Sequence, residues 1–201
     1  MRAGWIQPLW IAAATFVVVT VLGIALGPSQ FRGDEMEYFA MTYALVENGS
    51  PTLTPAVQSA LQVAFPSRAA PTIVKAVDGS DDALHFWFLS ALAAPFFALC
   101  KAVGLDWKHC FLFVNALALA ISAGAMSFYF RWRAAGLLLV GLSASPLLPY
   151  MNVAHGEVFS VSLLAVAAVF VAQDRPLAAA VVTSVLDENG RNRTWREVGG
   201  L

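Results

Sequence analysis

The chain has 201 residues, of which 59% are hydrophobic and only 12% charged, a composition that excludes an ordinary soluble domain and a disordered chain. Its net charge of −1 excludes a basic surface for nucleic acid, and its two cysteines are too few for a disulfide framework. We therefore expect an all-α fold, a polytopic α-helical membrane protein with about five transmembrane helices and a partly helical outer loop after the first.

Stretches without charged residues locate the expected spans. In chain order they cover residues 3–31, 83–100, 109–130, 134–156, 158–173 and 176–186. The first four have 18 residues or more, which is enough to cross a bilayer. The fifth, with 16, must borrow residues from its flanks, and the sixth, with 11, runs into a polar tail. We expect residues 1–175 to form the transmembrane region and residues 176–201 an incomplete sixth segment with its tail.

The first stretch sets the expected orientation. Its apolar core of 20 residues, 6–25, is long for a signal peptide, which is the alternative interpretation, and further spans follow it. Arg2 places the N-terminus in the cytoplasm, so the loop 32–82 is expected outside. Two lysines follow the second stretch and two arginines the third, so the charge rule does not orient the later spans.

The outer loop 32–82 is too long for an unstructured connector, and its sequence contains helix signals. Asp34 can cap a helix in which Glu37 occupies the reciprocal capping-box position. Apolar residues then recur at helical spacing until Asn48-Gly49 ends the helix. We expect this amphipathic helix to lie along the membrane surface.

The rest of the loop predicts a second short helix and an extended segment. Thr54-Pro55 is typical of a helix start, with Thr54 as the cap. Residues 72–77 are β-branched and apolar, which favours an extended chain, and a turn follows them. We expect Asp81 or Asp82 to cap the second span.

Few ionisable residues are placed where they could carry chemistry. Asp34 and Glu35 at the start of the outer loop could act as general bases or hold a divalent cation, although capping explains Asp34 equally well. His85 opens the second span in an aromatic run and could bind a phosphate or a metal, yet such runs are typical of interfacial belts. Arg68 and Lys75 could pair with an anionic substrate or be solvated.

Glu157 lies between two apolar stretches, with no basic residue nearby. An ionisable group at membrane depth normally faces a cavity or a partner. The alternative is that Glu157 caps the fifth helix at the water-exposed end of a loop.

The order of these features is more specific than any one of them. Gly33-Asp34-Glu35 follows the first span with Tyr38 close behind, residues 85–88 open the second, and Ser145-Pro146 precedes His155-Gly156-Glu157-Val158. This order resembles the N-terminal part of the GT-C superfamily of polytopic glycosyltransferases. The closest likeness is to the bacterial branch related to dolichyl-phosphate-mannose protein mannosyltransferases and aminoarabinose transferases. It covers nearly all of residues 1–175, the front part of the family's usual length.

The resemblance implies transfer of a sugar from a polyprenyl-phosphate donor to a glycan, lipid or protein acceptor, at the outer face of the bacterial inner membrane. Asp34, with Glu35 beside it, would be the catalytic base or would hold a divalent metal ion. His85 would approach the donor phosphate, and Tyr38 and Glu157 would belong to the binding site.

Counting spans creates a conflict within this interpretation. Three expected spans separate His85 from Glu157, and three crossings put the two residues on opposite faces unless one stretch is re-entrant or tilted. Two alternatives therefore stand beside the enzyme. The first is a non-catalytic multi-pass membrane protein, such as an assembly subunit or a transporter fragment, and the second is an inactive truncated product.

Overall fold

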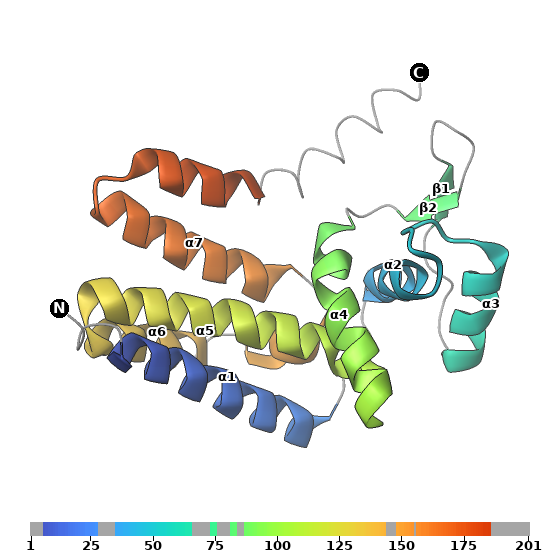
Figure 1. Cartoon of the computed structure of the whole chain (residues 1–201), viewed down its shortest axis with the longest axis horizontal. Helices are drawn as coiled ribbons and strands as arrows, with labels where there is room; N and C mark the ends of the chain where they lie inside the picture. The colour runs from blue at the N-terminus through green and yellow to red at the C-terminus, as the bar shows by residue number, and fades with distance from the viewer. Residues whose placement is uncertain are drawn as a thin grey trace. The chain divides into compact units, whose positions relative to one another are not determined.

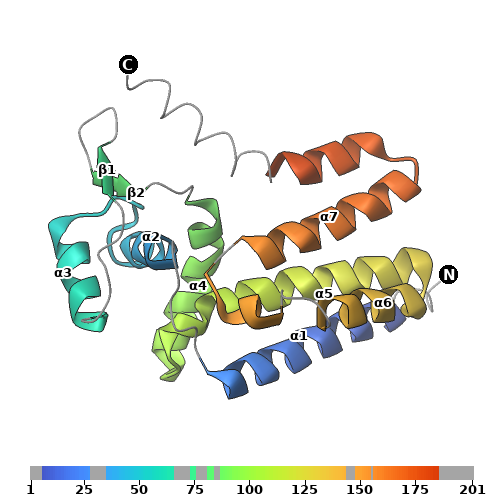
Figure 2. The same cartoon turned by 180° about the vertical axis from the view of Figure 1, so that it is seen from behind.

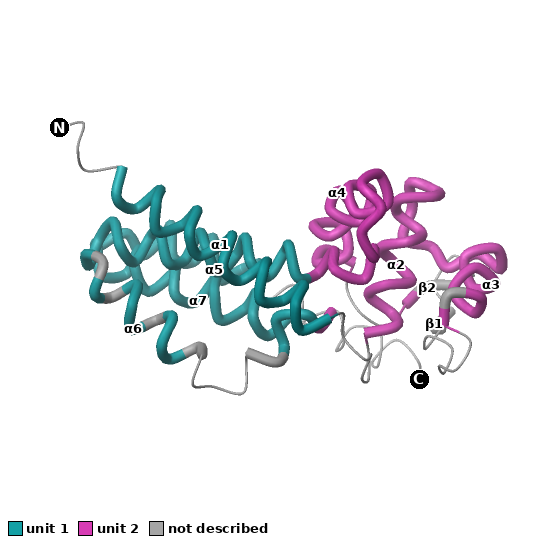
Figure 3. The backbone as a smooth tube through the Cα atoms, turned by 90° about the horizontal axis from the view of Figure 1, so that it is seen from below, with its two compact units in different colours: residues 1–27, 112–152, 156–188 teal, residues 28–111, 153–155, 189–201 magenta. Residues whose placement is uncertain are grey.

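The computed structural model describes residues 6–27, 35–65, 73–75, 81–83, 87–143, 148–154 and 156–185. These residues are mostly helical (Figure 1). They divide into two compact units (Figure 3). Unit 1 contains the described residues within 6–27, 112–152 and 156–185, and unit 2 contains those within 35–111 together with 153–154.

Unit 1 is a helical bundle. It consists of α1 (Ile6–Leu26), α5 (Cys110–Phe130, except its first two residues), α6 (Trp132–Ser143), the 3₁₀ helix η2 (Leu148–Asn152), α7 (Glu157–Ala172) and the helix Pro176–Val185. By length and composition, α1 and the segment Trp107–Phe130, which contains α5, are apolar enough to cross a membrane. The other apolar helices of the described chain are shorter, so two of the five expected spans meet this criterion.

The helices α1 and α5 run antiparallel and approach closely at two glycines (Figures 1 and 2). A Cβ atom added at Gly23 would collide with the side chain of Leu112, and one added at Gly124 would come within 3.2 Å of the Ala12 Cβ. Small residues at such crossings let helix backbones pack tightly, as they do in membrane bundles.

The interior of unit 1 is rich in small and polar residues, while its surface carries large apolar ones. The small or polar buried residues include Thr15, Gly23, Asn115, Ala116, Ala118, Ala120, Ser122, Ala123, Ser127, Asn152, Ser162 and Ala167. The exposed large residues include Leu9, Trp10, Val17, Val18, Val21, Leu22, Leu26, Ile121, Leu137, Val140, Leu164, Val171, Leu177 and Val181. This distribution is the inverse of that expected for a bundle surrounded by water.

Unit 2 is organised around α2 (Glu35–Asn48). Other segments of unit 2 bury the first turns of this helix on all sides. Around it lie α3 (Pro55–Ala64), the antiparallel strands β1 (Ile73–Lys75) and β2 (Asp81–Ala83), α4 (Phe88–Val103) and the 3₁₀ helix η1 (Trp107–His109). The helix α4 packs along α2. The rings of Phe39, Phe65, Phe97, Trp107 and Phe111 form the aromatic core of this unit, with centroid separations of 4.8–6.3 Å among the pairs in contact.

Local signals in the outer loop predicted two helices correctly. The first runs to Asn48, where Gly49 takes a left-handed φ of 67°. The second begins after Thr54, whose side chain accepts a hydrogen bond from the Val57 amide. Residues 73–75 are extended, as expected.

Two expectations about the loop were wrong. Asp81 and Asp82 do not cap a helix, because they lie in β2 and α4 begins only at Phe88 without a side-chain cap. The helix α2 is not an amphipathic surface helix, since its buried residues lie on all sides of its axis rather than on one face.

Candidate functional site

The carboxylate of Glu35 connects the start of α2 to a segment far away in sequence. Glu35 is fully buried, and its Oε1 accepts a hydrogen bond from the backbone amide of Ala154 at 3.2 Å, across 119 residues. Ala154 is also fully buried. Glu35 is the first residue of α2, where the positive end of the helix dipole favours a carboxylate. The acidic motif and the segment that leads toward Glu157 therefore meet within unit 2.

Glu37 is the second buried acid of α2, with 3% of its surface exposed. Residues two apart on a helix point to different sides, so Glu35 and Glu37 do not form a carboxylate pair.

Tyr38 is held by the polar groups of two helices. Its backbone carbonyl accepts hydrogen bonds from the Thr42 hydroxyl at 2.7 Å and from the Ser90 hydroxyl of α4 at 3.0 Å. Its ring meets Phe111 edge-on, with centroids 6.4 Å apart. Tyr38 thereby joins α2 to α4 and to the first residues of α5.

Two asparagines hold the chain immediately before Ala154. Within unit 1, Asn115 Nδ2 of α5 donates to the carbonyls of Met151 at 3.1 Å and Tyr150 at 3.4 Å. Asn152 Nδ2 donates to the carbonyl of Gly23 in α1 at 2.9 Å. The sequence analysis did not select Asn115 at all. The sequence did indicate that Asn115 has a hydrogen-bond partner, because its amide side chain lies in an otherwise apolar stretch, where an unpaired polar group would cost free energy.

Glu157 begins α7, and its side chain is exposed. The next residue, Val158, packs in a cluster with Leu112 and Met151. This contact places the start of α7 at the same end of unit 1 as the start of α5 and the end of η2.

The structure describes only one of the four remaining predicted site residues. Asp34, Arg68 and His85 lie outside the described residues. The backbone of Lys75 lies in β1 opposite Asp81 in β2. The structure thus brings Glu35 to Ala154, while the places of Asp34, Arg68 and His85 stay predictions.

A divalent metal fits Glu35 poorly. Metal ions such as Mg²⁺ keep several oxygen ligands, including water, whereas Glu35 is fully buried and accepts a backbone hydrogen bond. Among the residues that the structure describes, no group of three or more His, Cys, Asp or Glu side chains is arranged to hold a metal ion. The buried Glu35 therefore fits a contact that positions the backbone of Ala154 better than it fits a metal ligand.

Comparisons of the chain with models of protein families, with curated protein sequences and with solved structures found no match.

Proposed function

We propose that the chain is a membrane-embedded glycosyltransferase, or part of one, that transfers a sugar from a polyprenyl-phosphate donor to an acceptor hydroxyl at the outer face. The observation that supports this proposal best is the hydrogen bond between Glu35 and Ala154. Within unit 2 it joins the acidic start of the outer loop to Ala154, which precedes Glu157 in the chain, and the resemblance to GT-C enzymes implies roles for both motifs.

The composition of unit 1 supports its insertion in a bilayer. Large apolar side chains cover the outside of every helix of the bundle, including those shorter than a full span. Lipid tails solvate these large apolar side chains favourably. The small and polar residues inside the bundle allow close packing and hydrogen bonds between helices. One such bond runs from the Ser122 hydroxyl of α5 to the Ser162 carbonyl of α7 at 2.8 Å.

The assignment of α4 to unit 2 supports the placement of the acidic motif and Glu157 on the same side of the membrane. The helix α4 belongs to unit 2 and packs along α2, so it need not be counted as a crossing. Two passes then remain between the outer loop and Glu157. The first is α5, and the second is the return through α6 and η2, which ends where Asn152 binds the Gly23 carbonyl near the end of α1. An even number of passes returns the chain to the same face.

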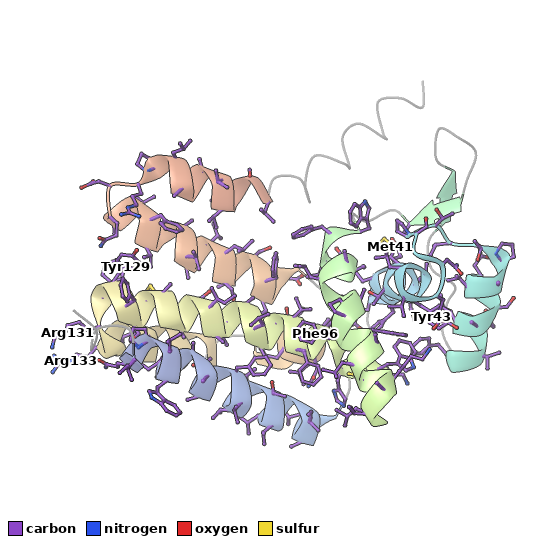
Figure 4. All side chains as sticks on the ribbon, viewed as in Figure 1. Met41, Tyr43, Phe96, Tyr129, Arg131 and Arg133 are labelled. Atoms are coloured by element: carbon purple, nitrogen blue, oxygen red, sulfur yellow. The ribbon has the colours of Figure 1, made fainter. Side chains whose placement is uncertain are left out.

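Basic residues at the opposite end of unit 1 support the orientation. Arg131 and Arg133 lie at the turn between α5 and α6, as Figure 4 shows, and Arg175 lies at the turn after α7. Because α5 and α7 run in the same direction, both turns lie at the end away from Glu157. The preference of arginine for the cytoplasmic side supports an orientation in which this end of unit 1 faces inward and Glu157 faces outward.

The proposed chemistry is an inverting displacement at the anomeric carbon. The acceptor oxygen forms a bond to C1 of the donor sugar while the bond from C1 to the phosphate oxygen breaks, and polyprenyl phosphate leaves with the bonding electrons. Asp34 takes the proton of the acceptor hydroxyl. A cationic side chain, for which Arg68, Lys75 and His85 are the candidates, offsets the charge on the departing phosphate.

The test measures transfer by membranes that contain the full chain. We would supply a panel of polyprenyl-phosphate sugars and follow the release of polyprenyl phosphate. Asp34→Asn is expected to abolish release without changing membrane insertion. Asp106→Asn is the matched control, because Asp106 is exposed and caps η1, a role that asparagine also fills. Release that persists in Asp34→Asn would refute the proposal.

A non-catalytic membrane subunit is the second candidate. The burial of both Glu35 and Glu37 favours it, because buried carboxylates can serve the fold alone. This candidate predicts that Asp34→Asn leaves every lipid-linked sugar pool unchanged, whereas Glu35→Ala reduces the amount of folded protein in the membrane.

A further inference from the structure

The helix α4 is largely apolar on two opposite faces. Its inner face is buried within unit 2 and consists of Leu89, Ser90, Ala93, Phe97 and Cys100. The residues at the opposite angular positions are exposed, and we name them the α4 patch: Pro95, Ala98, Leu99, Ala102 and Val103. The exposed fraction reaches 50% at Leu99 and 60% at Val103. A helix that is hydrophobic all round needs an apolar environment on its second face as well.

The single charged residue of α4 points away from the patch. The Nζ atom of Lys101 lies 2.7 Å from Oε1 of Glu47 in α2 and 5.7 Å from the centre of the Phe97 ring on the inner face. The ammonium group is therefore turned toward α2. The helix α3 provides a contrast, because its exposed face carries the polar residues Ser59 and Gln62 beside Val63.

The chain that follows α4 indicates what covers the patch. Only residues 104–106 separate the end of α4 from the segment Trp107–Phe130, which is long and apolar enough to cross a membrane and whose first residues belong to unit 2. Leu105, in this connection, adds another apolar side chain that is 40% exposed. The C-terminal end of α4 thus lies next to the point where the chain enters the bilayer, and lipid is the apolar partner available there.

The contacts between α4 and α2 favour a helix in the membrane plane over a crossing. They extend from Ser90, whose hydroxyl donates to the Tyr38 carbonyl at 3.0 Å, to Lys101, which pairs with Glu47. A crossing by α4 would carry α2 and its three glutamates into the hydrocarbon core, where ionisable groups are costly. The 16 residues of α4 also reach only about 24 Å, less than the thickness of about 30 Å of that core.

We infer that the α4 patch contacts the acyl chains of the outer leaflet, so that α4 lies in the membrane plane as the lipid-facing side of unit 2. The inference rests on the membrane insertion and orientation in the proposed function, and not on its chemistry. The helix α2 packs on the inner face of α4, and the axes of packed helices are about 8–10 Å apart. The start of α2, with Glu35, therefore lies at the level of the lipid headgroups, where the phosphate of a polyprenyl-phosphate donor also lies.

Nitroxide labels measure the depth of the patch in the bilayer. The full chain is reconstituted into vesicles of phosphatidylethanolamine and phosphatidylglycerol with one introduced cysteine, at Leu92, Leu99 or Val103, and both native cysteines are buried. Collisions of the label with oxygen, which concentrates in lipid, are compared with its collisions with a water-soluble nickel chelate. The ratio of oxygen to nickel collisions should be at least about threefold higher at positions 99 and 103 than at Val63→Cys, because an interfacial helix inserts its apolar face about 5–10 Å deep. Val63 is the matched control, since it is 83% exposed on α3 beside polar residues.

Depth along the helix separates a helix in the plane from a crossing. Leu92 and Val103 lie on the same side of α4, about three turns or roughly 16 Å apart along its axis. The inference predicts depths at these positions that agree within about 5 Å. Depths that differ by about 16 Å would overturn it in favour of a crossing.

Two further results would overturn the inference. A collision ratio at positions 99 and 103 equal to that at position 63 would place the patch in water. Few collisions with either probe, together with dipolar broadening between labelled chains, would show that a second copy of the chain covers it. The spectra need no transfer activity, so absence of transfer by the parent would refute the proposed function while the depths still decide the inference.

Discussion

The close approach of α1 and α5 at Gly23 predicts a large difference between two glycine-to-alanine substitutions. An alanine Cβ at Gly23 meets the Leu112 side chain, and Leu112 is fully buried against Leu119, Met151 and Val158, so it has little room to move. Overpacking of this kind costs about 1–3 kcal/mol, from which a gain of up to about 1 kcal/mol in helix propensity is subtracted. With the full gain subtracted, we expect Gly23→Ala to lower the free energy of unfolding by up to about 2 kcal/mol.

Gly136 in α6 provides the opposite case. Among the described residues, no atom apart from its chain neighbours and the nearby backbone of α6 lies within 4 Å of a Cβ built there, so Gly136→Ala should keep only the propensity gain and stabilise the chain by up to about 1 kcal/mol. The free energies can be measured by SDS titration in mixed micelles, followed by far-UV circular dichroism. Gly23→Ala with stability equal to or above that of Gly136→Ala would refute the packing of α1 on α5.

A double-mutant cycle assigns the cost to the named contact. Leu112→Ala alone should destabilise the chain by about 2–5 kcal/mol, because it leaves a cavity in the cluster. Combined with Gly23→Ala, its effect should be smaller than the sum of the two by about 1 kcal/mol, since the collision no longer occurs.

Three further predictions concern unit 2 and the topology. Lys101→Met removes the 2.7 Å ion pair with Glu47 and should cost less than about 1 kcal/mol, because both side chains are partly exposed. The hydrogen bond to Glu47 raises the pKa of Lys101 above its ordinary 10.5, so denaturation at a series of pH values should show this contribution intact below 10.5 and lost as the pH rises through the raised value. Phe39→Ala should lower the free energy of unfolding by about 3–5 kcal/mol, measured as above, because Phe39 is fully buried at the centre of the aromatic core. A cysteine at position 133 should react with a membrane-impermeant maleimide only after cells are permeabilised, since Arg133 lies at the proposed cytoplasmic end.

Local sequence signals predicted the helices of the outer loop because capping and helix-ending residues act within a few positions. Thr54 and Gly49 are examples, and both perform the expected roles. The long apolar stretch at the N-terminus likewise predicted α1. These features depend on propensity and backbone geometry, which a single sequence reports directly.

Apolar composition alone could not separate lipid contact from protein contact. The stretch 83–100 was expected to be a span; its helix α4 buries Leu89, Ala93 and Phe97 within unit 2 but exposes Leu99, so its crossing of a membrane stays a prediction. The stretch 134–156 had no charged residue to mark its interruption, yet α6 ends at Ser143 and a 3₁₀ helix follows.

The hydrogen bonds of residues 150–154 were beyond prediction for a different reason. They join residues that are 35 to 129 positions apart, and no local pattern couples them. Asn115 and Asn152 were visible as amides in apolar stretches, but their partners are backbone atoms, which the sequence does not distinguish from one another.

The central claim is that the acidic motif and Glu157 share the outer face of the membrane. Single cysteines at Asp34, Glu157 and Arg175 test it most directly, through reaction with a membrane-impermeant maleimide in intact and permeabilised cells. The account predicts that positions 34 and 157 react in intact cells and that position 175 reacts only after permeabilisation. Reaction of position 157 together with position 175, and not with position 34, would contradict it.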